Sequence, residues 1–198
     1  MPAFPPATHL LYLHGFRSSP QSAKARQVAA RVQAQHPAVH WWCPQLPPSP
    51  ADAWELLCSG TRHWPRDTMA VVGSSLGGFY ATAVAEHTGC RAVVLNPAVF
   101  PARDLARYIG EHSSWHAPED RFFFRADYID ELRALETGAL THPGRLMAVI
   151  EKGDELLDWR DMVARYPGST LRLVEGGDHA LSDFDAHIDA VFDFLRLA

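Results

Sequence analysis

The chain has 198 residues, of which 47% are hydrophobic and 21% are charged, and its formal net charge is -5. This length suits one domain with a full core, and the composition is that of an ordinary globular protein. A net negative charge lacks the basic footprint that nucleic acids or anionic membrane surfaces require. We therefore expect no nucleic-acid partner and no membrane partner.

The N-terminal segment has neither the basic start nor the apolar run of a signal peptide. The apolar runs elsewhere have the length of strands and fall far short of the roughly 20 residues that a membrane span needs. Three cysteines, Cys43, Cys58 and Cys90, form an odd set without metal-like spacing. These features predict reduced cysteines in a cytoplasmic protein.

The predicted elements alternate along the chain between short apolar strands and helices. We expect strands at residues 9–14, 39–43, 69–72, 91–95, 146–151 and 170–174, and helices at about 22–35, 51–62, 79–87 and 181–195. Strands that are apolar on both faces are typical of parallel sheets with helices on both sides. The sequence therefore predicts a three-layer α/β fold with about six mostly parallel strands in the order 2-1-3-4-5-6.

About 50 residues, 97–145, separate the fourth expected strand from the fifth, which is far more than an ordinary connection needs. Helical stretches are expected at 102–110 and 128–137, whereas residues 113–125 show no clear period. We expect this insertion to cover the carboxyl edge of the sheet like a lid within a single domain of residues 1–198.

Residues 73–77, GSSLG, fit the G-x-S-x-G pattern, in which a strand turns sharply into a helix and exposes a serine hydroxyl. The apolar strand before the pattern and the alanine-rich helix after it supply the context that this motif requires. Gly73 and Gly77 leave room for the crossing backbones. The pattern predicts Ser75 as a nucleophile; Ser74 is off the centre of the motif, and a plain glycine-serine turn is the structural alternative.

A serine needs a base and an orienting acid, which follow it along the chain in this kind of fold in the order Ser, acid, His. Asp154 follows the fifth expected strand and His179 follows the sixth. The predicted triad is therefore Ser75, Asp154 and His179. As alternatives, Asp154 could be only the N-cap of the next helix, Asp158 could be the triad acid, and His179 could be an ordinary loop histidine.

A tetrahedral acyl intermediate needs two N–H donors for its oxyanion. The first is expected from Leu76, which follows the nucleophile, and the second from Phe16 in the loop after the first strand. Gly15 allows that loop to turn toward the site, although a plain strand-to-helix turn would look the same in sequence. We expect His14 to form hydrogen bonds within the loop.

Several segments together resemble the small bacterial YqiA-type esterases of the α/β-hydrolase superfamily: YLHGFRSSPQSAKA, GSSLGGFYA, LNPAV, GDELLD and GGDHALSDF. The resemblance extends from His9 to Phe184. It implies an α/β-hydrolase fold and activity on acyl esters, with acyl-CoA thioesters as a further class of substrate. It assigns the same triad and the same two oxyanion donors.

The sequence therefore predicts a serine esterase that acts through an acyl-serine intermediate on a small-molecule ester or thioester. The alternatives are an acyltransferase or lyase with the same triad, and a hydrolase fold that only binds. No pattern indicates a metal or an organic cofactor. His112 and His116 have a helical metal spacing, but Pro118 and the neighbouring serines favour a loop without further ligands.

Overall fold

The computed structural model describes residues 5–198 and contains a parallel sheet of six strands. The strands are β1 (His9–Leu13), β2 (His40–Trp42), β3 (Met69–Ser74), β4 (Arg91–Leu95), β7 (Leu146–Glu151) and β8 (Thr170–Val174). Their order is β2-β1-β3-β4-β7-β8, and every neighbouring pair is parallel. The predicted fold class and the predicted strand order are confirmed.

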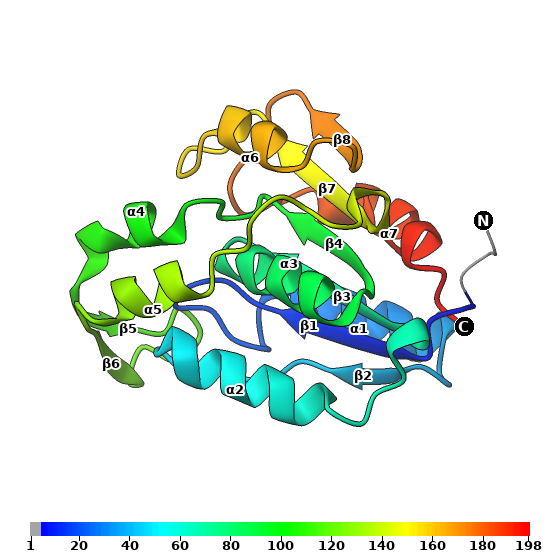
Figure 1. The fold of residues 1–198 in the computed structure, drawn as a ribbon, viewed down its shortest axis with the longest axis horizontal. Coiled ribbons are helices and arrows are strands. Elements are labelled where there is room, and N and C mark those ends of the chain that lie inside the picture. Colours follow the sequence, from blue (N-terminus) through cyan, green and yellow to red (C-terminus); the bar gives the residue numbers. More distant parts are fainter. Residues whose placement is uncertain (1–4) are drawn as a thin grey trace.

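Helices cover both faces of this sheet (Figure 1). They are α1 (Ala23–Gln35) and α7 (Ile188–Leu195) on one face, and α2 (Pro50–Thr61), α3 (Leu76–Thr88) and α6 (Trp159–Arg165) on the other. The alternation of β1 produces the two cores: Leu10 and Tyr12 pack with α1 and α7, and Leu11 and Leu13 pack toward α2 and α3. All four side chains are fully buried.

The helix ends follow local sequence signals. Ser22, Ser49 and Asp158 are the N-caps of α1, α2 and α6, and each accepts a hydrogen bond from a backbone N–H of the first turn. Helix α3 ends at Gly89, whose φ of 75° lies in the left-handed region where glycine is favoured. These caps set the points at which the chain returns to the sheet.

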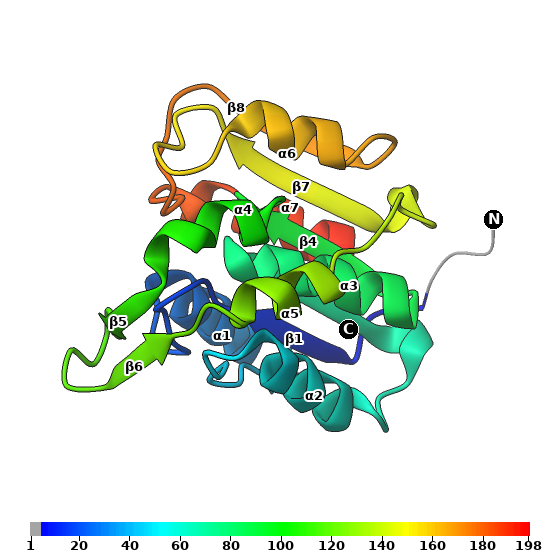
Figure 2. The same cartoon turned by 60° about the vertical axis from the view of Figure 1, so that its left-hand side comes forward.

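The segment 97–145 contains two short helices and a β-hairpin, followed on the chain by β7. Helix α4 (Pro101–Leu105) leads through a 3₁₀ turn to β5 (Gly110–Ser113), which pairs antiparallel with β6 (Arg121–Phe124). Helix α5 (Tyr128–Ala134) follows and packs against α4 and α2. Figure 2 shows the hairpin projecting beyond the main sheet, on the side where the parallel strands end.

Some predicted boundaries are wrong. The helix expected over 102–110 ends early because Gly110, with a φ of 142°, begins a strand. Residues 121–124 form β6, where no period was evident. The last helix begins at 188, not 181, because the preceding residues form turns and a 3₁₀ helix. Helix α6 was not among the predicted elements.

The three cysteines are free thiols, two of them half-buried and Cys90 buried. Burial raises the pKa of the Cys43 thiol to about 12, so this group stays protonated at neutral pH. Over residues 5–198, none of the helices combines the length and the apolar character that crossing a bilayer requires.

Candidate active site

Ser75 occupies the sharp turn between β3 and α3. Its φ is 56°, an unfavourable value for a residue with a side chain, and it points the hydroxyl away from the sheet. A Cβ on Gly73 would collide with the Gly77 carbonyl, and a Cβ on Gly77 would collide with the Leu13 carbonyl. Both glycines therefore provide the room that the sequence pattern predicts.

The structure brings Ser75, His179 and Asp154 together from the ends of three parallel strands. His179 Nε2 lies 2.9 Å from Ser75 Oγ, and His179 Nδ1 lies 2.8 Å from Asp154 Oδ2. The Asp154 side chain has no exposed surface, and the His179 side chain is 18% exposed. The hydroxyl, the imidazole and a buried carboxylate thus form a continuous hydrogen-bonded chain that is open to solvent at the serine.

Asp154 and Asp158 have different structural positions. The second carboxylate oxygen of Asp154 accepts hydrogen bonds from the backbone N–H groups of Leu156 and Leu157, at 2.8 and 2.9 Å. Those bonds hold its other oxygen toward His179. Asp158 is the N-cap of α6, and its exposed side chain accepts from the Arg160 N–H. The geometry therefore places Asp154, and not Asp158, against the histidine.

A buried polar clamp, formed by Asn96 and Glu151, holds the loop that carries His179. The Asn96 amide donates to the carbonyls of Asp178, at 3.0 Å, and His179, at 3.4 Å. Its oxygen accepts the Glu151 N–H at 2.8 Å. The Glu151 carboxylate accepts the Asp178 N–H at 2.7 Å. Both side chains are almost fully buried, so these bonds are shielded from water.

The glycine pair before Asp178 makes this clamp possible. Gly177 has a φ of 78°, and a Cβ there would collide with the Glu151 carboxylate. Asn96 has a φ of 39°, which suits a turn residue before Pro97, but its hydrogen bonds across the sheet depend on spatial neighbours that no sequence pattern reveals.

Glu151 is a fully buried acid. Its pKa is raised to about 7, chiefly by burial and also by a hydrogen bond to the Asp183 carboxyl and by the charges of Asp183 and Asp178. The Asp178 N–H bond acts in the opposite direction. Glu151 is therefore poised between its neutral and charged forms near neutral pH.

Phe16 and Leu76 lie beside the serine. Leu76 is the first residue of α3, so its N–H belongs to the unpaired donors at the helix start. A Cβ on Gly15 would lie 3.1 Å from Ser75 Cβ, so the loop backbone before Phe16 passes directly over the nucleophile. His14 supports this loop, as expected: Nδ1 lies 3.0 Å from the Gly15 carbonyl, and Nε2 accepts the Leu46 N–H at 3.1 Å.

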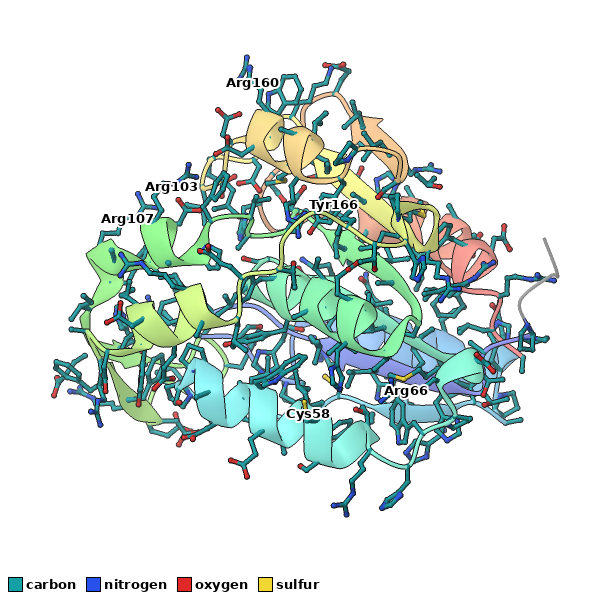
Figure 3. All side chains as sticks on the ribbon, in the orientation of Figure 1. Cys58, Arg66, Arg103, Arg107, Arg160 and Tyr166 are labelled. Carbon is teal, nitrogen blue, oxygen red and sulfur yellow. The ribbon has the colours of Figure 1, made fainter. Side chains whose placement is uncertain are left out.

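Three clefts surround the serine and its loop. A cleft of about 150 Å³ is lined by Ser75, His179 and mostly apolar side chains from α4 to Leu157. Arg107 lies at its edge, and Figure 3 shows it beside Arg103 on the same side of the molecule. A second cleft, of about 210 Å³, also touches Ser75 and is lined by polar groups that include Lys24. A third, of about 610 Å³, lies beyond Phe16.

One group of side chains in residues 5–198 has the spacing of metal ligands: Glu151, Asp183 and His187, with ligand atoms within 4.8 Å of one another. Arg172 Nε lies 3.1 Å from His187 Nδ1. Arginine can only donate, so His187 Nδ1 accepts this bond. A neutral His187 ring therefore carries its proton on Nε2, and this N–H faces the carboxyl groups as a donor. His112 and His116 belong to no such group among the described residues.

A family model matches almost the whole chain. Residues 9–196 match the model of a family described as "Uncharacterised protein family (UPF0227)". The chain belongs to this family. The match spans all six strands of the main sheet and all three residues of the hydrogen-bonded chain at Ser75. The match supports the resemblance of the sequence motifs to the YqiA-type esterases.

Solved structures share the fold. The alpha/beta hydrolase domain-containing protein 10 from mouse is similar with a TM-score of 0.67 and 16% identity, covering 94% of this chain and 90% of that chain. Est1E from Butyrivibrio proteoclasticus has a TM-score of 0.64 and 15% identity, covering 96% and 86%. The Pyrococcus furiosus esterase Pf2001 has a TM-score of 0.61 and 15% identity, covering 96% and 80%. These similarities establish the α/β-hydrolase fold.

Proposed function

We propose that this UPF0227 member is a serine hydrolase that cleaves small acyl esters, with thioesters as a second class of substrate. The observation that carries the proposal is the hydrogen-bonded chain from Ser75 Oγ through His179 to the buried Asp154. A nucleophile, a base within hydrogen-bonding reach and an acid that orients the base are the three parts that acyl transfer through serine requires.

In the proposed acylation step, Ser75 Oγ attacks the carbonyl carbon of the ester while His179 Nε2 takes the hydroxyl proton. Asp154 keeps the proton on Nδ1 and stabilises the imidazolium that forms. His179 then protonates the leaving oxygen or sulfur as its bond to carbon breaks. An acyl-serine and a free alcohol or thiol result.

Water completes the reaction by the same route. His179 removes a proton from water, the hydroxide oxygen bonds to the acyl carbon, and the proton returns to Ser75 Oγ as the acid leaves. The backbone N–H groups of Phe16 and Leu76 stabilise the oxyanion in both steps, since both residues flank Ser75 in its cleft. We further propose that residues 97–145 act as a cap, because Leu105, Tyr108 and Trp115 line that cleft.

A fluorophosphonate probe tests the nucleophile directly, because an activated serine attacks its phosphorus, releases fluoride and becomes phosphonylated. We expect the wild-type protein to be labelled and Ser75→Ala to remain unlabelled. Ser74→Ala is the matched control: it removes the neighbouring hydroxyl, lies outside the proposed chain, and should still be labelled. Labelling of Ser75→Ala to the wild-type level, or no labelling of the wild type, would rule out the proposed nucleophile.

Hydrolysis of p-nitrophenyl esters tests the reaction. We expect turnover of short esters by the wild type and a loss of at least about 10³-fold in kcat for Ser75→Ala. A protein that is labelled but hydrolyses neither esters nor acyl-CoA thioesters would retain an activated serine with a different acyl acceptor or substrate, contrary to the proposal.

A further inference from the structure

We infer that the side chain of Phe16 limits the acyl group to a short chain, by separating the cleft at Ser75 from the larger cavity behind it. This inference rests on the proposed ester hydrolysis and adds the size class of the acyl group. It assigns the Phe16 ring a role in specificity that is separate from the role of the Phe16 backbone N–H.

The cleft at Ser75 favours a small apolar acyl group. Its walls are mostly apolar side chains around the serine, among them Leu105, Tyr108 and Leu157, and they also include Arg17, Asp104 and Arg107. Its volume of about 150 Å³ is below the 300–1,000 Å³ of sites for drug-sized ligands. The cleft is therefore suited to a short acyl chain.

The adjacent cavity has the space that the cleft lacks. Its volume is about 610 Å³, and its wall includes Leu46, Phe122, Phe124 and Leu132. It contacts neither Ser75 nor His179, but Phe16, Arg17 and Leu76 line both spaces. These three residues are therefore the partition between the small cleft and the large cavity. Phe16 also lines the second cleft at Ser75, which shares His14, Gly15 and Ser18 with the large cavity, so Phe16 borders all three spaces.

The Phe16 side chain is the part of that partition that a substitution can shorten. Its ring makes edge-on contacts with Phe122 and Phe124, which line the large cavity, at centroid distances of 5.9 and 5.2 Å. It also packs against Tyr108, which lines the small cleft, at 5.8 Å. The ring thus contacts the walls of both spaces, whereas Leu76 is fixed in the first turn of α3.

Truncation of the side chain leaves the backbone donor in place, so the volume effect can be separated from oxyanion stabilisation. We would measure kcat/KM for p-nitrophenyl butanoate and octanoate with the wild type, Phe16→Ala and Phe122→Ala. Phe122→Ala is the matched control, since it enlarges the large cavity without removing the ring between the spaces. Phe16→Leu provides a second, milder truncation if Phe16→Ala does not fold, as judged by thermal melting.

We expect the wild type to prefer butanoate over octanoate by about tenfold or more, a discrimination within the range of hydrophobic pockets. Phe16→Ala should raise the octanoate-to-butanoate ratio by about tenfold, Phe16→Leu by less, and Phe122→Ala by at most about threefold. The inference is overturned if the wild type hydrolyses both esters equally, or if the two alanine variants change the ratio alike. Inactivity of the wild type toward every ester instead overturns the proposed function and this inference with it.

Discussion

The loop that carries His179 and the hairpin of β5 and β6 border the same cleft but are held by different forces. Buried side chains fix the His179 loop through hydrogen bonds, with Asn96 and Glu151 contacting the peptide next to the histidine. The hairpin packs on the Phe16 loop through rings, and two hydrogen bonds link it to Arg17, whose Nε donates to the Ser113 carbonyl and whose carbonyl accepts the Trp115 N–H. The Trp115 side chain at its tip is 64% exposed and stacks on the Arg17 guanidinium at 4.0 Å.

The two regions meet two different requirements of the site: precise placement of the reacting atoms, and a cleft of suitable shape. Hydrogen bonds are directional and fix atoms that must meet within a few tenths of an ångström. Aromatic contacts tolerate several geometries, so they can shape a cleft without fixing a reacting atom. Changes on the hydrogen-bonded side should therefore lower turnover, whereas changes on the aromatic side should alter which substrate is preferred.

The largest expected effect is that of Asp154→Asn. An asparagine keeps the shape of the side chain, but its amide nitrogen can present a donor to His179 Nδ1 and favour the wrong tautomer. We expect kcat to fall by about 10³- to 10⁴-fold while KM changes little. Steady-state kinetics on a short p-nitrophenyl ester measure this change.

Asp158→Asn is the control for Asp154→Asn. This residue caps α6 and does not contact His179, and asparagine is also a good N-cap. Its kcat should remain within about threefold of the wild-type value. Equal losses in the two variants would show that the acid was assigned to the wrong position.

Asn96→Ala should have the next largest effect. The substitution removes two donated bonds and one accepted bond beneath the His179 loop, and it leaves the buried Glu151 N–H unpaired. We expect kcat to fall by about 10- to 100-fold, the cost of misplacing a catalytic group by about 1 Å. KM should be almost unchanged, because Asn96 does not line the cleft at Ser75.

A purely structural role for Asn96 would give a different result. The variant would then melt at a lower temperature, but the fraction that remains folded would turn over substrate and react with a fluorophosphonate at the wild-type rate. Active-site titration with the probe measures that fraction, and kcat per labelled site separates the two interpretations.

The sequence indicates the main sheet well because its strands are short, apolar and separated by clear turn signals. It indicates the positions of Ser75, Asp154 and His179 because each follows a strand end in a local pattern. The hairpin is not evident, since β5 is polar and β6 has three consecutive phenylalanines without alternation. The clamp is not evident either, because Asn96 and Glu151 meet Asp178 only across neighbouring strands.

The last expected effect concerns stability rather than turnover. The native state holds a proton on Glu151 up to a pKa of about 7, whereas in the unfolded chain this acid ionises near its ordinary value of 4.5. Between these values the native state binds more protons, so its stability falls as the pH rises, by up to about 1.4 kcal/mol per pH unit for one proton. Above pH 7 this contribution no longer changes.

Glu151→Gln should remove that dependence, because the amide cannot ionise beside Asp178 and Asp183, which raise the pKa, or near Lys24, whose charge interacts with Glu151. Urea unfolding at pH 5 and pH 8 should show a smaller loss of stability in the variant than in the wild type. Glu175→Gln, at an 84% exposed side chain, should follow the wild type. Parallel curves for wild type and Glu151→Gln would mean that Glu151 ionises normally, and that hydrogen bonding to a charged carboxylate holds the His179 loop at all these pH values.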